Sequence, residues 1–184
     1  AQIRTFHSFG SWFLRRYADN AGLGDNFTVY DEEDMLTLVL KAYPELNRKE
    51  AGEAVHFISL AKDFCYTPES EELGTIFSKR EVQNGIVLKK FPEIYEAYEK
   101  RLRSTGNVDF GDLIMLPVMI LQENEGIRGQ MQRRFRVIMV DEYQDSNVAQ
   151  FKLLQCLSGI SEGSGTYVCV VGDDDQSIYS FRGA

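Results

Sequence analysis

The chain has 184 residues, of which 43% are hydrophobic and 26% charged, and its formal net charge is −8. This composition is that of a soluble globular protein, and the negative charge argues against a protein that binds polyanions through its overall charge. The longest apolar run, LIMLPVMIL at 113–121, contains a proline and is too short to span a membrane. We therefore expect no membrane partner.

Three cysteines, Cys65, Cys156 and Cys169, lack the spacing of a metal site and cannot all pair, so we expect reduced thiols in a cytoplasmic protein. The first four residues lack the basic start and apolar block of a signal peptide. Arginines gather in 101–136 and acidic residues in 137–184. This distribution fits a contact with phosphates in one place and metal in another, although solvated helix faces would give the same pattern.

The N-terminal residues QIRTFHSF indicate the end of a strand and a loop, followed by a helix from Ser11 to Tyr17. Asp31 can cap a helix whose apolar positions 35, 36, 39 and 40 form one face. Further amphipathic segments follow, separated by turn signals, at 49–64, 69–83 and 91–103. The region from 31 to 103 is therefore predicted to be an all-helical module.

After Gly106 the pattern changes. An apolar helix is expected at 112–122, followed by a short polar helix that ends in MQRRFR. Two apolar strands, 137–140 and 167–171, enclose a helix at 148–157 that Ser146 or Asn147 can cap. Apolar strands without alternation on either side of a helix are typical of a βαβ unit with parallel strands buried on both faces.

Both strands run into acidic residues: Asp141-Glu142 after the first, and 173–175 after the second. Ligands of open α/β sheets bind beyond the carboxyl ends of the strands, so these carboxylates should share one cleft. Mg²⁺ prefers oxygen ligands, and of two adjacent acids one can hold the metal while the other activates a water. From this motif alone, an alternative in which Asp141 and Asp145 cap the next helix is equally open.

Four stretches, in chain order, carry a more specific signal: TFHSFG at 5–10, NVDFGDLIMLP at 107–117, DEYQD at 141–145 and VVGDDDQSIYSFRGA at 170–184. With them the chain resembles superfamily 1 DNA helicases of the UvrD/PcrA/Rep group over essentially its whole length. The resemblance implies an α/β fold: a partial RecA-like parallel sheet (subdomain 1A) with a large all-helical insertion (subdomain 1B). On this reading 1–11 and 123–184 belong to 1A, and 12–122 form the 1B-like part.

The resemblance also implies roles for single residues. Asp141 would hold the Mg²⁺ of Mg-ATP, Glu142 would act on the attacking water, and Gln176 would sense the γ-phosphate. DNA would be contacted by Thr5, His7, Phe110, Tyr179, Phe181 and Arg182. Aromatic side chains stack on bases regardless of sequence, but outside these motifs each of these aromatics would be interpreted as a core residue.

Two positions depart from the family pattern. Phe181 stands where the family usually has Trp, and Gly111 replaces a common Asp. Both departures bear on the strength of the DNA contact.

The chain contains no Gly-Lys pair and hence no P-loop of the form G-x-x-x-x-G-K-[ST], whose amides and lysine hold the phosphates. We therefore expect a fragment of an ATP-dependent 3′–5′ DNA helicase of repair or replication, with ATP and single-stranded or duplex DNA as partners. The fragment by itself should not hydrolyse ATP, and an exposed sheet edge would favour self-association. The alternatives are a non-catalytic DNA- or protein-binding module that docks through 31–103, and a metal-dependent nuclease.

Overall fold

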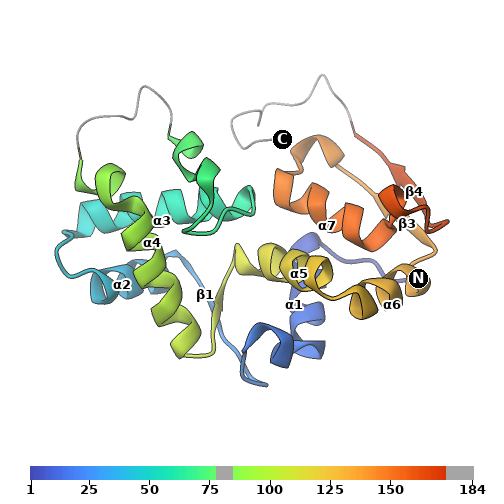
Figure 1. The fold of residues 1–184 in the computed structure, drawn as a ribbon, viewed down its shortest axis with the longest axis horizontal. Coiled ribbons are helices and arrows are strands. Elements are labelled where there is room, and N and C mark those ends of the chain that lie inside the picture. The colour runs from blue at the N-terminus through green and yellow to red at the C-terminus, as the bar shows by residue number, and fades with distance from the viewer. Residues whose placement is uncertain (78–84, 173–184) are drawn as a thin grey trace.

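The computed structural model describes residues 1–77 and 85–172, and the predictions made for 78–84 and 173–184 lie outside the described residues. The described chain forms two lobes with separate hydrophobic cores (Figure 1). The helical lobe comprises residues 30–77 and 85–104, and the α/β lobe comprises 1–29 and 105–172. Within the described residues, every helix is too short or too polar to cross a membrane.

The helical lobe is built from three long helices and a short 3-10 helix: α2 (Glu32–Ala42), α3 (Arg48–Asp63), the 3-10 helix Glu71–Ile76 and α4 (Ile86–Ser104). The predicted cap at Asp31 is confirmed. Its carboxylate accepts a hydrogen bond from the Asp34 amide, and the Asp34 carboxylate accepts one from the Asp31 amide. The two bonds satisfy amides that have no partner within the helix.

The described part of the α/β lobe contains four α-helices: α1 (Phe6–Arg16), α5 (Asp112–Glu123), α6 (Glu125–Arg134) and α7 (Val148–Ser158). Three short 3-10 helices lie at Ala18–Ala21, Tyr143–Asp145 and Ile160–Glu162. The strands β3 (Val137–Val140) and β4 (Tyr167–Val170) form a βαβ unit with α7. Helix α5 lies at the centre of the lobe and packs against α1, α6 and α7. The α1–α5 contact is close, because a Cβ added to Gly10 would lie 2.6 Å from the Leu113 carbonyl carbon. Only glycine at position 10 allows this approach.

A two-residue parallel pair joins the lobes. Strand β1 (Val29–Tyr30) enters the helical lobe and β2 (Val108–Asp109) leaves it. The two crossing segments therefore run side by side at the lobe junction.

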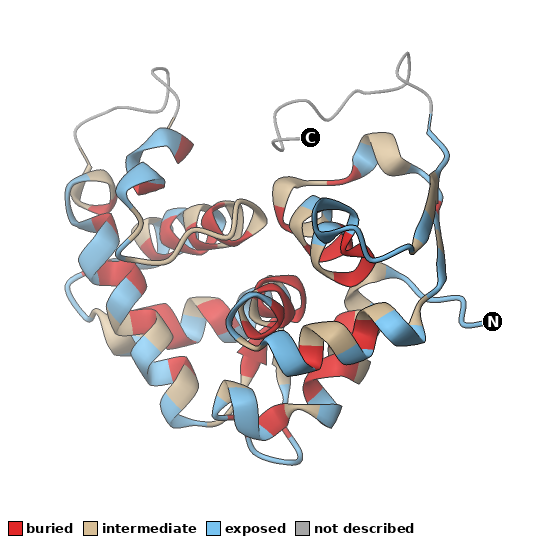
Figure 2. Cartoon of the chain, turned by 45° about the vertical axis from the view of Figure 1, so that its right-hand side comes forward, coloured by how far each residue is buried: buried red, intermediate tan, exposed pale blue. Residues whose placement is uncertain are grey.

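The predicted βαβ unit is confirmed, because β3 and β4 pair in parallel with Val137 opposite Tyr167 and Val140 opposite Val170. The prediction that both strands are buried was wrong. On one face of β3, Ile138 packs against the core of the α/β lobe and Val140 is buried, whereas on the opposite face Met139 is 74% exposed. Figure 2 colours the described residues by their burial. An unbroken apolar run cannot distinguish a strand covered on one face from one covered on both.

The predicted strand end at the N-terminus was also wrong, and the predicted loop is shorter than expected, because only residues 1–5 form neither helix nor strand. Helix α1 begins at Phe6 rather than Ser11, because the Thr5 hydroxyl accepts a hydrogen bond from the Ser8 amide at 3.1 Å and caps it. Helix α4 likewise begins earlier than predicted, at Ile86. The segment predicted at 69–83 is a 3-10 helix at Glu71–Ile76 as far as the structure describes it.

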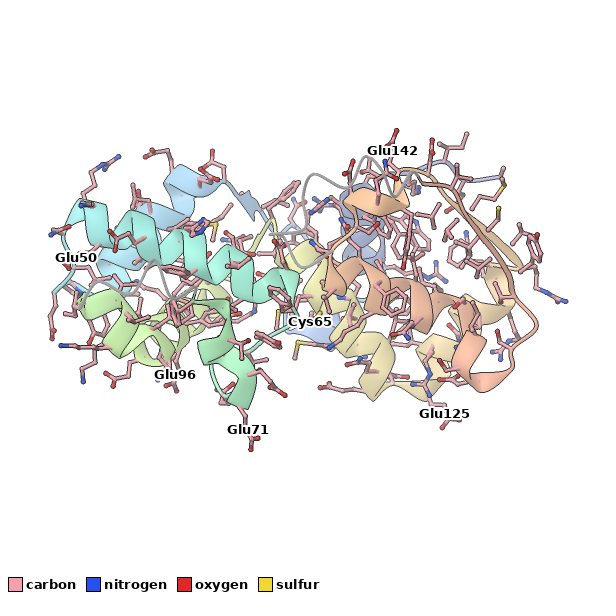
Figure 3. All side chains as sticks on the ribbon, turned by 90° about the horizontal axis from the view of Figure 1, so that it is seen from above. Glu50, Cys65, Glu71, Glu96, Glu125 and Glu142 are labelled. Carbon is pink, nitrogen blue, oxygen red and sulfur yellow. The ribbon has the colours of Figure 1, made fainter. Side chains whose placement is uncertain are left out.

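The hydrophobic cores divide the chain near residues 30 and 105, so α1 and α5 pack in the α/β lobe. The subdomain boundaries at 11/12 and 122/123 stay a prediction, since packing alone does not assign subdomains. The lobes touch through the C-terminal end of α3, which contacts α5 and α7. In Figure 3 the labelled Cys65, just beyond α3, lies at this junction.

Candidate nucleotide and nucleic-acid sites

The acidic pair Asp141-Glu142 directly follows β3 at the carboxyl end of the parallel strands. Both residues are exposed, and Figure 3 shows Glu142 at the surface of the α/β lobe. The Asp141 carboxylate accepts a hydrogen bond from the Glu142 amide at 2.9 Å, and Gln144 donates to the Glu142 carboxylate at 2.6 Å. Glu142 has φ 52°, a left-handed conformation that a residue with a side chain adopts at a cost. The backbone therefore turns sharply at this residue.

The segment after β4 lies against the same loop. The Tyr143 amide donates to the Val171 carbonyl at 3.0 Å, and a Cβ on Gly172 would lie 2.6 Å from a Gln144 side-chain oxygen. The ends of both strands therefore meet at one edge of the sheet. The acidic run 173–175 and Gln176 lie outside the described residues, so the predicted convergence on one cation pocket stays a prediction.

The cap of α7 is Asn147, one of the two predicted candidates. Its side chain accepts from the Gln150 amide at 2.9 Å, and the Gln150 side chain accepts from the Asn147 amide. The alternative in which Asp141 or Asp145 caps this helix is therefore wrong. The side-chain amide of Asn147 also donates a hydrogen bond to the Asp63 carboxylate of α3 at 3.1 Å, which connects the start of α7 to the helical lobe.

Two of the predicted DNA contacts meet at the junction of the lobes. The rings of His7 and Phe110 stack with centroids 3.8 Å apart and an interplanar angle of 14°. The helix approach at Gly10 explains this contact, because His7 lies one turn before Gly10 on α1 and Phe110 lies three residues before Leu113. Burial lowers the pKa of His7, so the ring is neutral at pH 7, whereas Phe110 remains 57% exposed.

The stacked pair borders an open groove of about 610 Å³ that also contains Tyr30 and Ser59. Asp31, Glu32 and Asp63 line the same groove, and carboxylates repel phosphate groups. The groove therefore suits an aromatic base better than a phosphate backbone. Thr5, the third described residue of the predicted DNA path, is exposed and caps α1, while Tyr179, Phe181 and Arg182 lie outside the described residues.

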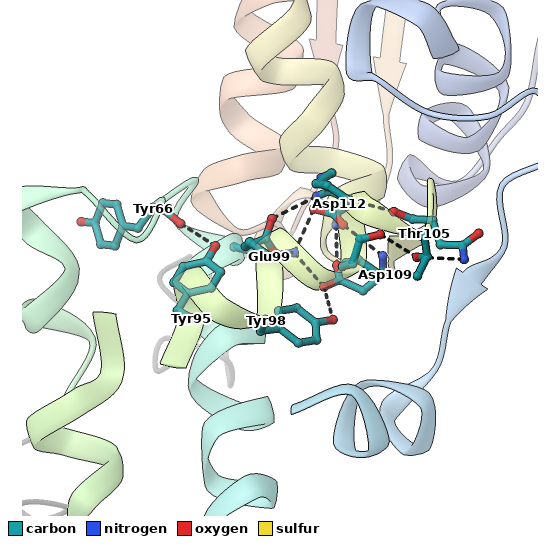
Figure 4. Close-up of polar contacts among 11 residues, drawn as sticks. Tyr66, Tyr95, Tyr98, Glu99, Thr105, Asp109 and Asp112 are labelled. Atoms are coloured by element: carbon teal, nitrogen blue, oxygen red, sulfur yellow. Dashed lines mark hydrogen bonds and ion pairs between the residues drawn. The ribbon is translucent and has the colours of Figure 1, made fainter. Parts of the chain in front are cut away.

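A buried ionic cluster at the lobe junction was not predicted (Figure 4). The ammonium group of Lys62, 1% exposed on α3, donates to Asp109 at 2.7 Å and to Asp112 at 2.9 Å, and also contacts Glu99 of α4. The Tyr98 hydroxyl donates to Asp109 at 2.8 Å. Arg103 pairs with Asp112 at 2.7 Å and with Glu99 at 3.1 Å.

The cluster holds three carboxylates and two cations, of which Lys62, Asp109 and Asp112 are fully buried while Glu99 and Arg103 are partly exposed. Burial alone would lower the pKa of Lys62, but Asp109, Asp112 and Glu99 outweigh it and raise the pKa well above its ordinary value. Burial also opposes ionisation of Asp112, yet Lys62 and Arg103 lower its pKa to about 2. For Asp109, burial and the neighbouring Asp112 prevail over Lys62, and the pKa is raised.

Oxygens of Glu99, Asp109 and Asp112 lie within 4.8 Å of one another, a spacing that would suit a metal ion. The Lys62 ammonium contacts all three carboxylates and supplies the positive charge there. The sequence did contain one signal for this cluster. Lys62 continues the buried stripe Ala51, Val55 and Ile58 of α3, and a lysine on such a stripe needs anionic partners.

Residues 1–184 match the family model of the UvrD/REP helicase N-terminal domain, so the chain belongs to that family and the resemblance noted in the sequence is confirmed.

Three relatives are similar to the chain over 99% of its length. ATP-dependent DNA helicase Rep of Escherichia coli is 35% identical over 185 residues, which are 26% of that protein. ATP-dependent DNA helicase PcrA of Bacillus subtilis is 36% identical over 186 residues, and ATP-dependent DNA helicase UvrD1 of Mycobacterium tuberculosis is 35% identical over 190 residues, each 24% of the relative. The chain therefore spans about a quarter of the length of the curated relatives it matches.

Proposed function

We propose that the full-length protein carrying this chain is an ATP-dependent 3′–5′ DNA helicase. The observation that carries the proposal is the match of the whole chain to the helicase N-terminal domain, shared with relatives that are named ATP-dependent DNA helicases. The parallel βαβ unit supports a partial RecA-like subdomain 1A, and the separate core of the helical lobe supports an inserted subdomain 1B.

Within this proposal the edge beyond β3 and β4 is the nucleotide side. Asp141 and Glu142 offer exposed carboxylate oxygens, and these fit Mg²⁺, which commonly takes one or two carboxylates together with phosphates and water. Asp141 would hold the ion, which would offset negative charge on the ATP phosphates. Glu142 would orient the attacking water and accept its proton. Gln176 would sense the γ-phosphate.

The DNA side is the lobe junction. Phe110, backed by His7, presents an aromatic face on which a base of single-stranded DNA can stack. Thr5 would lie along the same path, and Tyr179, Phe181 and Arg182 would extend it. The nearby acidic side chains mean that phosphate contacts must come from elsewhere.

ATP turnover by the full-length protein tests the proposal. DNA-stimulated hydrolysis and unwinding are expected, and Glu142→Gln should abolish turnover while leaving nucleotide binding intact. The matched control is Glu123→Gln, which alters an exposed carboxylate at the end of α5. Equal turnover by Glu142→Gln and wild type would refute the assigned role.

The 184-residue chain by itself has no P-loop sequence. We therefore expect no ATP hydrolysis by this chain above the level of its own Glu142→Gln variant.

A further inference from the structure

Phe110 lies in a turn, Asp109 to Asp112, whose two end residues bond to each other. Asp109 accepts a hydrogen bond from the Asp112 amide at 2.9 Å, and Asp112 accepts one from the Asp109 amide at 3.0 Å. Both aspartates are buried, whereas Phe110 between them is 57% exposed. The direction of the Phe110 ring therefore depends on what holds the two aspartates.

Lys62 of α3 bonds to the residues at both ends of this turn. Its ammonium donates to Asp109 at 2.7 Å and to Asp112 at 2.9 Å. The aliphatic part of the Lys62 side chain packs against Gly111, the second residue between the two aspartates. A Cβ on Gly111 would lie 2.9 Å from the Lys62 Cβ and 3.0 Å from its Cδ. The ammonium group and the aliphatic part of Lys62 together therefore fix the position and the orientation of the turn relative to α3.

The other polar partners hold only one end each. Tyr98 bonds to Asp109, and Arg103 pairs with Asp112. Among the described residues, Lys62 is the one side chain with polar contacts to both aspartates that also packs against Gly111. Since α3 belongs to the helical lobe, Lys62 fixes the turn relative to both lobes.

We propose that Lys62 is a positioning residue for DNA binding, which holds the Asp109–Asp112 turn so that Phe110 stacks on His7 and presents its free face to a DNA base. This inference rests on the proposed function, because the base contact of Phe110 belongs to that proposal. The positioning itself can be measured without DNA.

The experiment compares Lys62→Met with Lys49→Met in the 184-residue chain. Methionine keeps most of the stem and removes the ammonium, and Lys49 is an exposed lysine on the same helix. Nuclear Overhauser contacts between the His7 and Phe110 rings should be lost in Lys62→Met. The pKa of His7 should rise toward its ordinary value, because burial lowers it in the native protein. Lys49→Met should match the wild type in both measurements.

Binding of labelled single-stranded DNA at low salt provides the second measurement. Affinity should fall about 5- to 150-fold in Lys62→Met and by a similar factor in Phe110→Ala, the range expected for the loss of one base–aromatic stack. If Phe110→Ala binds the DNA as tightly as the wild-type chain, the DNA contact proposed for Phe110 is wrong and Lys62 has no DNA-binding role. The ring contacts then still decide whether Lys62 positions the turn.

A folded Lys62→Met variant with unchanged ring contacts and unchanged His7 titration would overturn the inference. If Lys62→Met does not fold, Lys62→Gln decides by the same NMR measurements. Glutamine keeps a hydrogen-bond donor at this position and removes the charge that contacts Asp109 and Asp112. A rise in the pKa of His7 together with weaker ring contacts supports the inference, and ring contacts and a His7 titration identical to the wild type refute it.

Discussion

Replacing Gly10 by alanine should separate α1 from α5 and disrupt the lobe junction. The new Cβ would lie 2.6 Å from the Leu113 carbonyl carbon, whereas nonbonded carbon atoms normally approach to about 3.5–4.0 Å. The helices would have to move apart by about 1 Å or more. Since His7 and Phe110 flank this contact one turn away, their stacking at 3.8 Å cannot survive such a shift unchanged.

Overpacking of this kind costs about 1–3 kcal/mol, and a contact with backbone rather than a flexible side chain belongs at the upper end. Gly52 provides the matched control. It lies inside α3, is exposed, and a Cβ there would have nothing within 4 Å. Gly52→Ala should therefore stabilise the protein by about 0.5–1 kcal/mol, the difference in helix propensity between the two residues.

Urea unfolding of both variants, followed by circular dichroism, measures the two free energies. The expected signs are opposite: Gly10→Ala loses about 3 kcal/mol and Gly52→Ala gains. A Gly10→Ala variant that unfolds within about 0.5 kcal/mol of the wild type and keeps the ring contacts between His7 and Phe110 would contradict this prediction.

Three further predictions follow from contacts at the junction. Asn147→Ala should lower the free energy of unfolding by about 1 kcal/mol more than the equivalent cap variant Asn47→Ala, because the second hydrogen bond of Asn147 is part-buried and joins the two lobes at Asp63, whereas that of Asn47 is exposed and stays within its own helix at Glu50; equal losses in urea melts would contradict this. Lys62→Met should be destabilised by about 3–5 kcal/mol at pH 7. That deficit should shrink as the pH falls toward 4. Lys62 lowers the pKa of both Asp109 and Asp112, so without it these carboxyl groups bind protons at a higher pH in the folded variant than in the folded wild type, and protonation removes buried charge that Lys62 no longer balances. A deficit that grows on acidification in pH-dependent melts would be inconsistent with this. Burial raises the pKa of Cys65 to about 11, so alkylation of native Cys65, followed by peptide mass spectrometry, should accelerate with pH up to that value, and rapid labelling at pH 7 would argue otherwise.

Local signals were sufficient for most of the secondary structure. The cap at Asp31, the apolar periodicity of α2 and α3, and the two β-rich runs around α7 each depend on residues within a few positions of one another, and each element was predicted. The prediction for the N-terminus failed because one capping hydrogen bond, accepted by the Thr5 hydroxyl, outweighed a sequence pattern typical of an extended segment. The prediction of strand burial failed because burial depends on which segments cover each face of the sheet. A run of apolar residues does not encode that information.

The candidate sites were less accessible to sequence reasoning. The contact between His7 and Phe110 joins residues far apart in the chain. The resemblance to helicases implied that both residues contact DNA, but it did not predict that their rings stack on each other. Their roles with DNA, and those of Asp141 and Glu142 with nucleotide, stay predictions. The Lys62 cluster was missed because its partners lie 37 to 50 positions away, and spacing within one helix cannot show which acids will meet a buried lysine.

The nature of that cluster bears on why charges rather than apolar side chains fill the lobe junction. Apolar residues of similar volume often stabilise a protein at least as well as a buried ion group, so stability alone does not explain Lys62, Asp109 and Asp112. Apolar packing is non-directional, whereas hydrogen bonds from one ammonium to two carboxylates fix the distance and angle between α3 and the Phe110 turn. A triple substitution of these three residues by apolar ones could therefore raise the melting temperature, yet it should leave Phe110 without a defined orientation toward His7. A variant that was more stable and also kept the ring contacts would show that packing alone positions Phe110.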